Sequence, residues 1–321
     1  MKNLLAVLGL AALAFVGGGI AHAQSYPKGT INLVIPLAPG DAADSTARLM
    51  GEELSKLLGA PVAVVNRPGA GGVLAVNSVV GAGKDGHTLL FTSNNALTFR
   101  RILDPQTATY DPARDLTTLG LAARTPIVIA IAGNLPYSDF AGMVDYAKKN
   151  PGTVRIGTAG AGSIGDFSVG TINALTGAGI TMVPFKGAAP AVTALLGGHV
   201  EGVALALGAV SRHLKSGAMK GVVTSAKFPD FPGIPTLPEL GYRQKLLGVW
   251  FGFFAPAGLP AEVAQVLIPA IEKTVNNPEV AAKLVALGIV REYRAPAAVL
   301  EEIDAEYETL KTVAKSAGLI K

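Results

Sequence analysis

The sequence predicts an α/β protein of two lobes, with mostly parallel sheets and helices on both faces of each sheet. Half of the residues are apolar and only 16% are charged, as expected for a globular protein with a large core. Short apolar runs alternate with amphipathic segments, a pattern that favours right-handed βα crossovers. A proline-rich stretch at 228–238 interrupts this alternation, and 321 residues are enough for two domains.

The first strand and the first helix show the pattern clearly. Residues 31–35 form a short apolar run, and in 42–58 the apolar residues recur at helical spacing on one face. The same alternation predicts strands at 61–65, 89–92, 127–132, 154–158, 182–183 and 200–205, and helices at 71–80, 138–149, from 163, and 188–196.

The C-terminal part is mainly helical, with helices expected at 261–275, 278–287 and 296–316. Two of them begin with a proline, whose missing N–H costs nothing in the first turn. Strands that cross between the lobes are expected near 119–132 and 249–254, the second of which is densely aromatic. Residues 24–124 and 248–321 would then form the first lobe, and residues 125–247 the second.

The N-terminus, residues 1–23, has the layout of a secretory signal peptide. Lys2 gives it a cationic start, residues 4–20 are apolar, and Ala-His-Ala ends at Ala23. A membrane anchor is the alternative, but the run is short for a membrane span and no basic cluster follows it. Cleavage after Ala23 would place the protein in the periplasm. Because the chain has no cysteine to carry a lipid anchor, we expect a freely diffusing monomer.

Composition and motifs argue against nucleic-acid, metal and cofactor chemistry. No basic run has interleaved aromatic residues, and no His/Cys/Asp cluster has metal-ligand spacing. The G-x-G-x-x-G at 160–165 follows a strand and opens a helix, as in a dinucleotide site. The acidic residue that should hold the ribose is missing, since the next strand ends at Lys186. We therefore expect no cofactor.

Catalysis has little support in the sequence. Residues 161–165 are one residue short of the G-x-S-x-G nucleophile elbow around Ser163. His87, His199 and His213 show no recognisable pairing with this serine. We expect a protein that is not an enzyme, with a secreted serine hydrolase using Ser163 as the alternative.

Four strand-to-helix junctions are rich in glycine or polar residues. They follow the carboxyl ends of strands, where open α/β sheets bind ligands, and helix starts suit small anions. Helix capping explains each junction taken singly, but four of them in both lobes predict a ligand cleft. The candidate binding residues at these junctions are Pro39, Gly40, Asp41, Ala42, Ala43, Asp44, Ser93, Asn94, Asn95, Gly160, Gly162, Ser163, Lys186 and Gly187.

A further turn at 66–72, Asn-Arg-Pro-Gly-Ala-Gly-Gly, is interpreted as a tight turn into a helix, with an anion-binding loop as the alternative.

Together these motifs resemble the Bug family, the extracytoplasmic solute receptors of tripartite tricarboxylate transporters. The resemblance covers nearly the whole mature chain and rests on Pro39-Gly40 with Asp44 and Arg48, and on the segments 66–72, 85–88, 158–163, 183–187, 195–198, 224–227 and 253–258. It implies a two-lobe periplasmic binding protein of the Venus-flytrap type, type II-like, with an interlobe cleft. Such receptors close on a small solute, usually a carboxylate, and deliver it to membrane transporter subunits. In them, backbone amides of the first loop hold one carboxylate.

The chain departs from the family pattern where a ligand is expected. The first loop carries Asp41, Ala42 and Ala43 in place of a glycine and hydroxyl residues, Asp166 follows Ser163, and the strand from residue 200 ends in Leu205-Ala206. A carboxylate ligand beside Asp41 would be repelled by roughly a few kcal/mol in a closed cleft. We therefore expect a ligand with a cationic, hydrogen-bond-donating or amide group and an apolar body against Leu205. If Asp41 only caps its helix, this inference fails.

Overall fold

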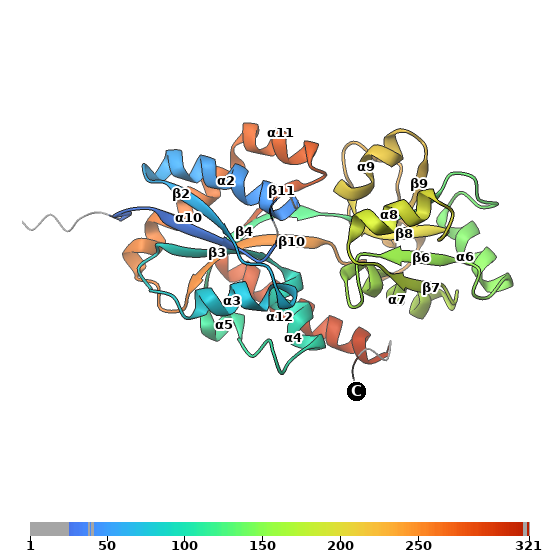
Figure 1. Cartoon of the computed structure of the whole chain (residues 1–321), viewed down its shortest axis with the longest axis horizontal. Coiled ribbons are helices and arrows are strands. Elements are labelled where there is room, and N and C mark those ends of the chain that lie inside the picture. Colours follow the sequence, from blue (N-terminus) through green and yellow to red (C-terminus); the bar gives the residue numbers. More distant parts are fainter. Residues whose placement is uncertain (1–25, 38, 40–41, 317–319, 321) are drawn as a thin grey trace, which may run out of the picture.

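Two lobes lie side by side along the long axis of the molecule, each built on one sheet with helices on both faces (Figure 1). The computed structural model describes residues 26–37, 39, 42–316 and 320. The expected signal peptide at 1–23 and two residues of the first loop, Gly40 and Asp41, lie outside the described residues. In the described part of the chain, no helix is both long and apolar enough to cross a membrane.

The sheet of lobe 1 has the strand order β11-β4-β10-β3-β1-β2. Side chains alternate along β1, so Leu33 packs toward one layer of helices and Val34 toward the other. The strands are β1 (Ile31–Ile35), β2 (Val62–Asn66), β3 (Thr88–Ser93), β4 (Leu116–Thr125), β10 (Val249–Pro256) and β11 (Val290–Arg294).

Two helical layers cover this sheet. One layer packs with Leu33 and consists of α2 (Ala42–Leu58), α10 (Ala261–Asn276) and α11 (Pro278–Ala286). The other includes α3 (Val73–Val80) and α12 (Pro296–Ser316), which pack with Val34 on the opposite face. Short elements at the edge of this layer are η1 (Ala70–Gly72), η2 (Asn95–Phe99), α4 (Arg100–Leu103) and α5 (Pro112–Asp115).

The sheet of lobe 2 has the order β7-β6-β8-β5-β9. Its core is also split into two layers, with α6 and α7 on one face and α8 and α9 on the other. The elements are β5 (Ile127–Ala132), β6 (Arg155–Thr158), β7 (Thr181–Pro184), β8 (Gly202–Ala206), β9 (Met219–Thr224), α6 (Phe140–Lys149), α7 (Ile164–Thr176), α8 (Ala188–Leu196) and α9 (Leu207–Lys215). A short turn, η3 (Pro238–Leu240), precedes the return to lobe 1.

Both sheets are mixed, whereas mostly parallel sheets were expected. β1 pairs in parallel with β2 and β3, and β6 with β7 and β8. The remaining pairs are antiparallel and all involve β10, β4 or β5. β10 enters lobe 1 and β5 enters lobe 2 from the side of the partner lobe, so each runs against the βα units of the sheet it joins, whereas β4 leaves lobe 1 in the direction of β3.

The two lobes touch on both sides of the space between them. The Phe99 ring of lobe 1 packs edge-on against Phe167 of lobe 2, with 4.9 Å between ring centroids. On the other side, the backbone of Gly208 in α9 lies so close to that of Leu287 that a β-carbon there would be 2.5 Å from the Leu287 carbonyl oxygen. The two lobes are therefore in direct contact beside the crossing strands.

Candidate functional site

A cavity of about 790 Å³ lies between the lobes. Lobe 1 contributes the residues that follow β1 and β3, together with η1, η2 and the start of α4. Lobe 2 contributes the end of β8 and the starts of α7, α8 and α9, and the crossing strands β5 and β10 form part of the wall. The cavity thus lies at the carboxyl ends of parallel strands, where α/β sheets bind ligands.

Seven of the residues expected at a ligand site line this cavity. They come from both lobes, from three of the four predicted junctions and from the end of β8: Ser93, Asn95, Gly160, Ser163, Gly187, Leu205 and Ala206. The fold therefore brings these seven residues to one cavity, and their contact with a ligand stays a prediction.

Asp166 turns back into its own loop and does not line the described wall of the cavity. Its side chain accepts a 2.5 Å hydrogen bond from Thr158 Oγ1 and a 2.7 Å bond from the N–H of Gly162. Burial raises the pKa of Asp166. Asp166 and Gly162 therefore shape the loop before α7, and the structure gives no support to a cationic ligand group at Asp166.

Ser163 caps the start of α7. Its hydroxyl accepts a 3.4 Å hydrogen bond from the N–H of Asp166, which is the ordinary role of a serine before a helix. Ile164 and Gly165, which follow it, line the cavity. Their N–H groups have no acceptor within the helix, so the positive end of α7 is directed at the cavity.

Asp44 is buried at the start of α2 and is linked through Asn66 to Leu37 at the end of β1. Its carboxylate pairs with Arg48 at 2.9 Å and accepts a hydrogen bond from Asn66 Nδ2, also at 2.9 Å. The same Asn66 amide donates to the carbonyl oxygen of Leu37, which lines the cavity. Asn66, the first residue of the turn at 66–72, therefore helps to hold the end of β1 in place, whereas Gly71 of the same turn lines the cavity.

Three other expected residues, Pro39, Asn94 and Lys186, lie away from the described part of the cavity wall. Nothing is described of the Ala42 and Ala43 side chains. Pro39 and Lys186 are exposed, and Ala42 and Ala43 begin α2. Asn94 is fully buried, and its amide donates to the Gly248 carbonyl and to Glu306 of α12. The prediction about Asp41 stays a prediction.

Sequence reasoning missed Arg100, a charged residue of the cavity wall. It follows η2, a π-helical turn, and stands next to a second arginine, Arg101. Nothing in the sequence distinguishes the two, because no motif surrounds them and only the rotation of the helix decides which one faces the cavity.

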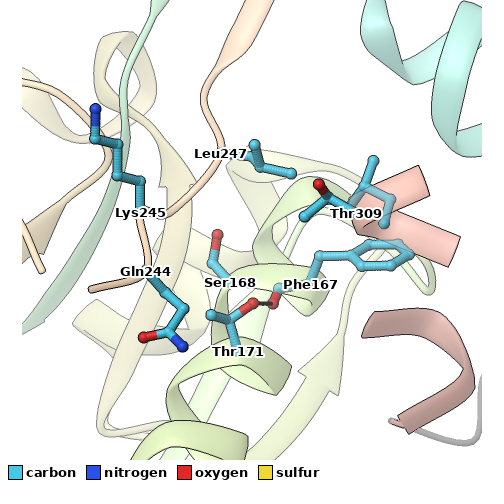
Figure 2. Close-up of a pocket in the computed structure, with 8 residues that line it drawn as sticks. Phe167, Ser168, Thr171, Gln244, Lys245, Leu247 and Thr309 are labelled. Carbon is cyan, nitrogen blue, oxygen red and sulfur yellow. Dashed lines mark hydrogen bonds between the residues drawn. The ribbon is translucent and has the colours of Figure 1, made fainter. Parts of the chain in front are cut away.

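A second, smaller cavity of about 170 Å³ lies where α7, the segment 244–247 and α12 meet (Figure 2). Figure 2 shows Phe167 and Leu247 beside Thr309 of α12, and the Lys245 ammonium directed away from them. Because Phe167 also packs on Phe99, this cavity belongs to the contact between the lobes.

No group of three or more His, Cys, Asp or Glu residues within the described ranges could hold a metal ion.

Comparison with known proteins identifies the family. Residues 46–318 match the profile of the tripartite tricarboxylate transporter family receptor, TctC. BugT of Bordetella pertussis is 31% identical over 291 residues, covering 90% of this chain and 89% of BugT. A UPF0065 protein of Agrobacterium vitis is 33% identical, covering 93% of this chain and 88% of its own length.

Solved structures agree with this assignment. R. palustris Rpa4515, determined with adipate, has a TM-score of 0.80 at 28% identity and covers 92% of this chain and 99% of its own. MatC from Rhodopseudomonas palustris, with bound malate, has a TM-score of 0.76 at 30% identity and covers 90% of this chain and 99% of its own. The periplasmic binding protein BugD has a TM-score of 0.77 at 26% identity and covers 92% of this chain and 99% of its own.

The Bug-family resemblance and the two-lobe binding-protein fold are thereby confirmed, and the hydrolase alternative finds no support. The chain belongs to the tripartite tricarboxylate transporter receptor family, and it is a solute-binding receptor of the periplasmic type, not an enzyme.

Proposed function

We propose that this receptor captures a small solute with a carboxylate group in the interlobe cavity and delivers it to membrane subunits of a tripartite transporter. The observation that carries the proposal is the composition of the cavity wall, to which both lobes and both crossing strands contribute. A ligand held there touches both lobes at once. It would therefore favour the closed arrangement over an open one by its differential affinity for the two.

The lining offers hydrogen-bond donors that suit a carboxylate. Asn95 contributes an amide, Ser93 and Ser163 contribute hydroxyl groups, and the start of α7 contributes backbone N–H groups. Adipate and malate in two similar structures support this ligand class. An acid that also carries an amine or amide remains within the proposal.

We also propose that delivery takes place in the periplasm, at membrane subunits of the transporter. The family is defined by its transporter, which supports docking on membrane subunits. The expected signal peptide and the likeness to periplasmic binding proteins support the periplasm as the place of capture.

The test uses the single tryptophan of the chain as its probe. Trp250 lies buried on β10 between Val249 and Phe251, both of which line the cavity. Fluorescence titration with mono- and dicarboxylates, amino acids and amides is expected to give a saturable change for at least one acid. A ligand at about 100 times its dissociation constant should also add about 2.7 kcal/mol to the free energy of unfolding. A fluorescence and melting profile unmoved by every acid in the screen would refute the proposed ligand class.

A further inference from the structure

The charge of the cavity wall is concentrated in one side chain. Among the lining residues that the structure describes, Arg100 is the only one that carries a charge, and none is a carboxylate. The guanidinium lies at the lobe 1 end of the cavity, beside η1.

Arg100 has no ionic or hydrogen-bonding partner for its side chain within the described residues, and its Nε is buried and unsatisfied. Two other arginines of lobe 1, in contrast, have carboxylate partners. Arg101 pairs with Asp111 at 3.3 Å and lies over the Tyr307 ring at 4.6 Å, and Arg124 pairs with Glu292 at 2.6 Å. A partly buried cation without a counter-charge is costly, so the site is built to receive an anion from outside the chain.

A glycine leaves the room that the Arg100 side chain occupies. The Arg100 stem lies directly against Gly71 of η1, and a β-carbon at Gly71 would collide with Arg100 Nε. Gly71 has a φ of 64°, which also favours glycine there. Asn95 Nδ2 donates to the Gly71 carbonyl at 3.3 Å, so an amide and a guanidinium are held together at one end of the cavity.

No charged side chain other than Arg100 lies in the described wall, so a second carboxylate would meet only neutral groups such as the Ser93 and Ser163 hydroxyls and the N–H groups at the start of α7. The crossing strands and the ends of β8 and α11 contribute mainly apolar side chains such as Val249, Phe251, Leu205 and Leu287. Thr125 also lies there, but its hydroxyl donates to the Gly288 carbonyl at 3.0 Å. The cavity volume of about 790 Å³ is within the range of sites for ligands much larger than a four-carbon acid.

We propose that Arg100 binds the single carboxylate of a monocarboxylic acid whose uncharged, largely apolar body fills the rest of the cavity. This inference rests on the proposed function and narrows its ligand class. The sequence-based expectation of a cationic ligand group depended partly on Asp166. That part is replaced, because the Asp166 carboxylate is engaged within its own loop.

The experiment compares matched ligands of equal length by isothermal titration calorimetry on the purified protein. The probes are the fatty acid, the α,ω-diacid and the fatty amide with six, eight and ten carbons. We expect the monoacid to bind at least tenfold tighter than the diacid and the amide at the best chain length. Arg100→Gln should weaken monoacid binding by about tenfold to a hundredfold, the usual range for a charge-assisted hydrogen bond, and leave amide binding unchanged.

The neighbouring arginine supplies the control. Arg101→Gln removes the same charge from the same helix but from a residue outside the described cavity wall, and it should leave monoacid affinity unchanged. Arg100→Gln should melt no lower than wild type without ligand, because it removes an unpartnered cation.

Two results would overturn the inference and leave the proposed function standing. One is a diacid that binds as tightly as the monoacid, and the other is monoacid binding that Arg100→Gln does not weaken. If the wild-type protein binds no acid of either series but responds to another acid in the wider screen, the inference fails and the proposed function stands; if it responds to no acid in either experiment, both fail.

Discussion

Glu306 gives the sharpest quantitative prediction. This α12 side chain is only 7% exposed, and its carboxylate accepts hydrogen bonds from Asn94 Nδ2 at 2.7 Å, Trp250 Nε1 at 3.0 Å and Thr98 Oγ1 at 3.1 Å. It ties the C-terminal helix to the end of β3, to η2 and to the crossing strand β10. Burial outweighs these three bonds and raises the pKa of Glu306 to about 7.

The size and sign of the effect follow from this pKa. Its ordinary value is 4.5, so the native state favours the protonated carboxyl. The stabilisation from Glu306 is complete below pH 4.5 and is lost as the pH rises through 7. A difference of about 2.5 pKa units corresponds to about 3 kcal/mol of unfolding free energy.

Urea unfolding at pH 5, 6, 7 and 8 measures this contribution. Other groups also titrate, so the informative quantity is the difference in unfolding free energy between wild type and Glu306→Gln at each pH. Wild type should lose stability relative to the variant by about 2.5 kcal/mol over this range, because part of the total is already lost at pH 5. Glu308→Gln, an exposed residue on the same helix, should show a constant difference from wild type. A constant difference for Glu306→Gln as well would show that the buried carboxylate keeps its ordinary pKa, and the reasoning would be refuted.

Two further predictions concern closure of the lobes. Gly208→Ala places a β-carbon 2.5 Å from the Leu287 carbonyl oxygen and forces apart two lobes that both line the cavity, so it should weaken binding of the best acid several-fold in calorimetry. Gly233→Ala, where a β-carbon meets open space, should not, and equal affinities for the two variants would contradict the role of this contact. Phe99→Ala removes a fully buried ring from the contact with Phe167 and should cost about 3–5 kcal/mol in urea unfolding. A loss below 1 kcal/mol would show that the interlobe cluster contributes little.

Local patterns predicted many elements because their cause is local. The expected bounds of the first helix match α2 (Ala42–Leu58), since its apolar residues recur at 3.6-residue spacing and pack on one face. The bounds of β1 and β5 were also correct, because each is a short run of apolar residues, interrupted only by the exposed Asn32 in β1.

Elements that depend on distant partners were missed. β11 reads Val-Arg-Glu-Tyr-Arg, a sequence with little strand character of its own. It pairs at the sheet edge with β4, about 170 residues earlier, where Glu292 meets Arg124 at 2.6 Å. The antiparallel direction of β5 and β10 was missed for the same reason, because it is determined by how the lobes connect.

By itself the sequence determined the family, the two-lobe α/β architecture and the strand ends where a ligand site should lie. It could not determine which polar side chains face the cavity. Asp166 resembles a ligand-binding residue in sequence, but its carboxylate accepts hydrogen bonds from Thr158 Oγ1 and the Gly162 N–H. Arg100 and Arg101 are adjacent in sequence, yet successive residues on a helix point about 100° apart. One therefore meets Asp111 and Tyr307 while the other reaches the cavity, and only the packing of η2 and α4 against Gly71 and lobe 2 decided which.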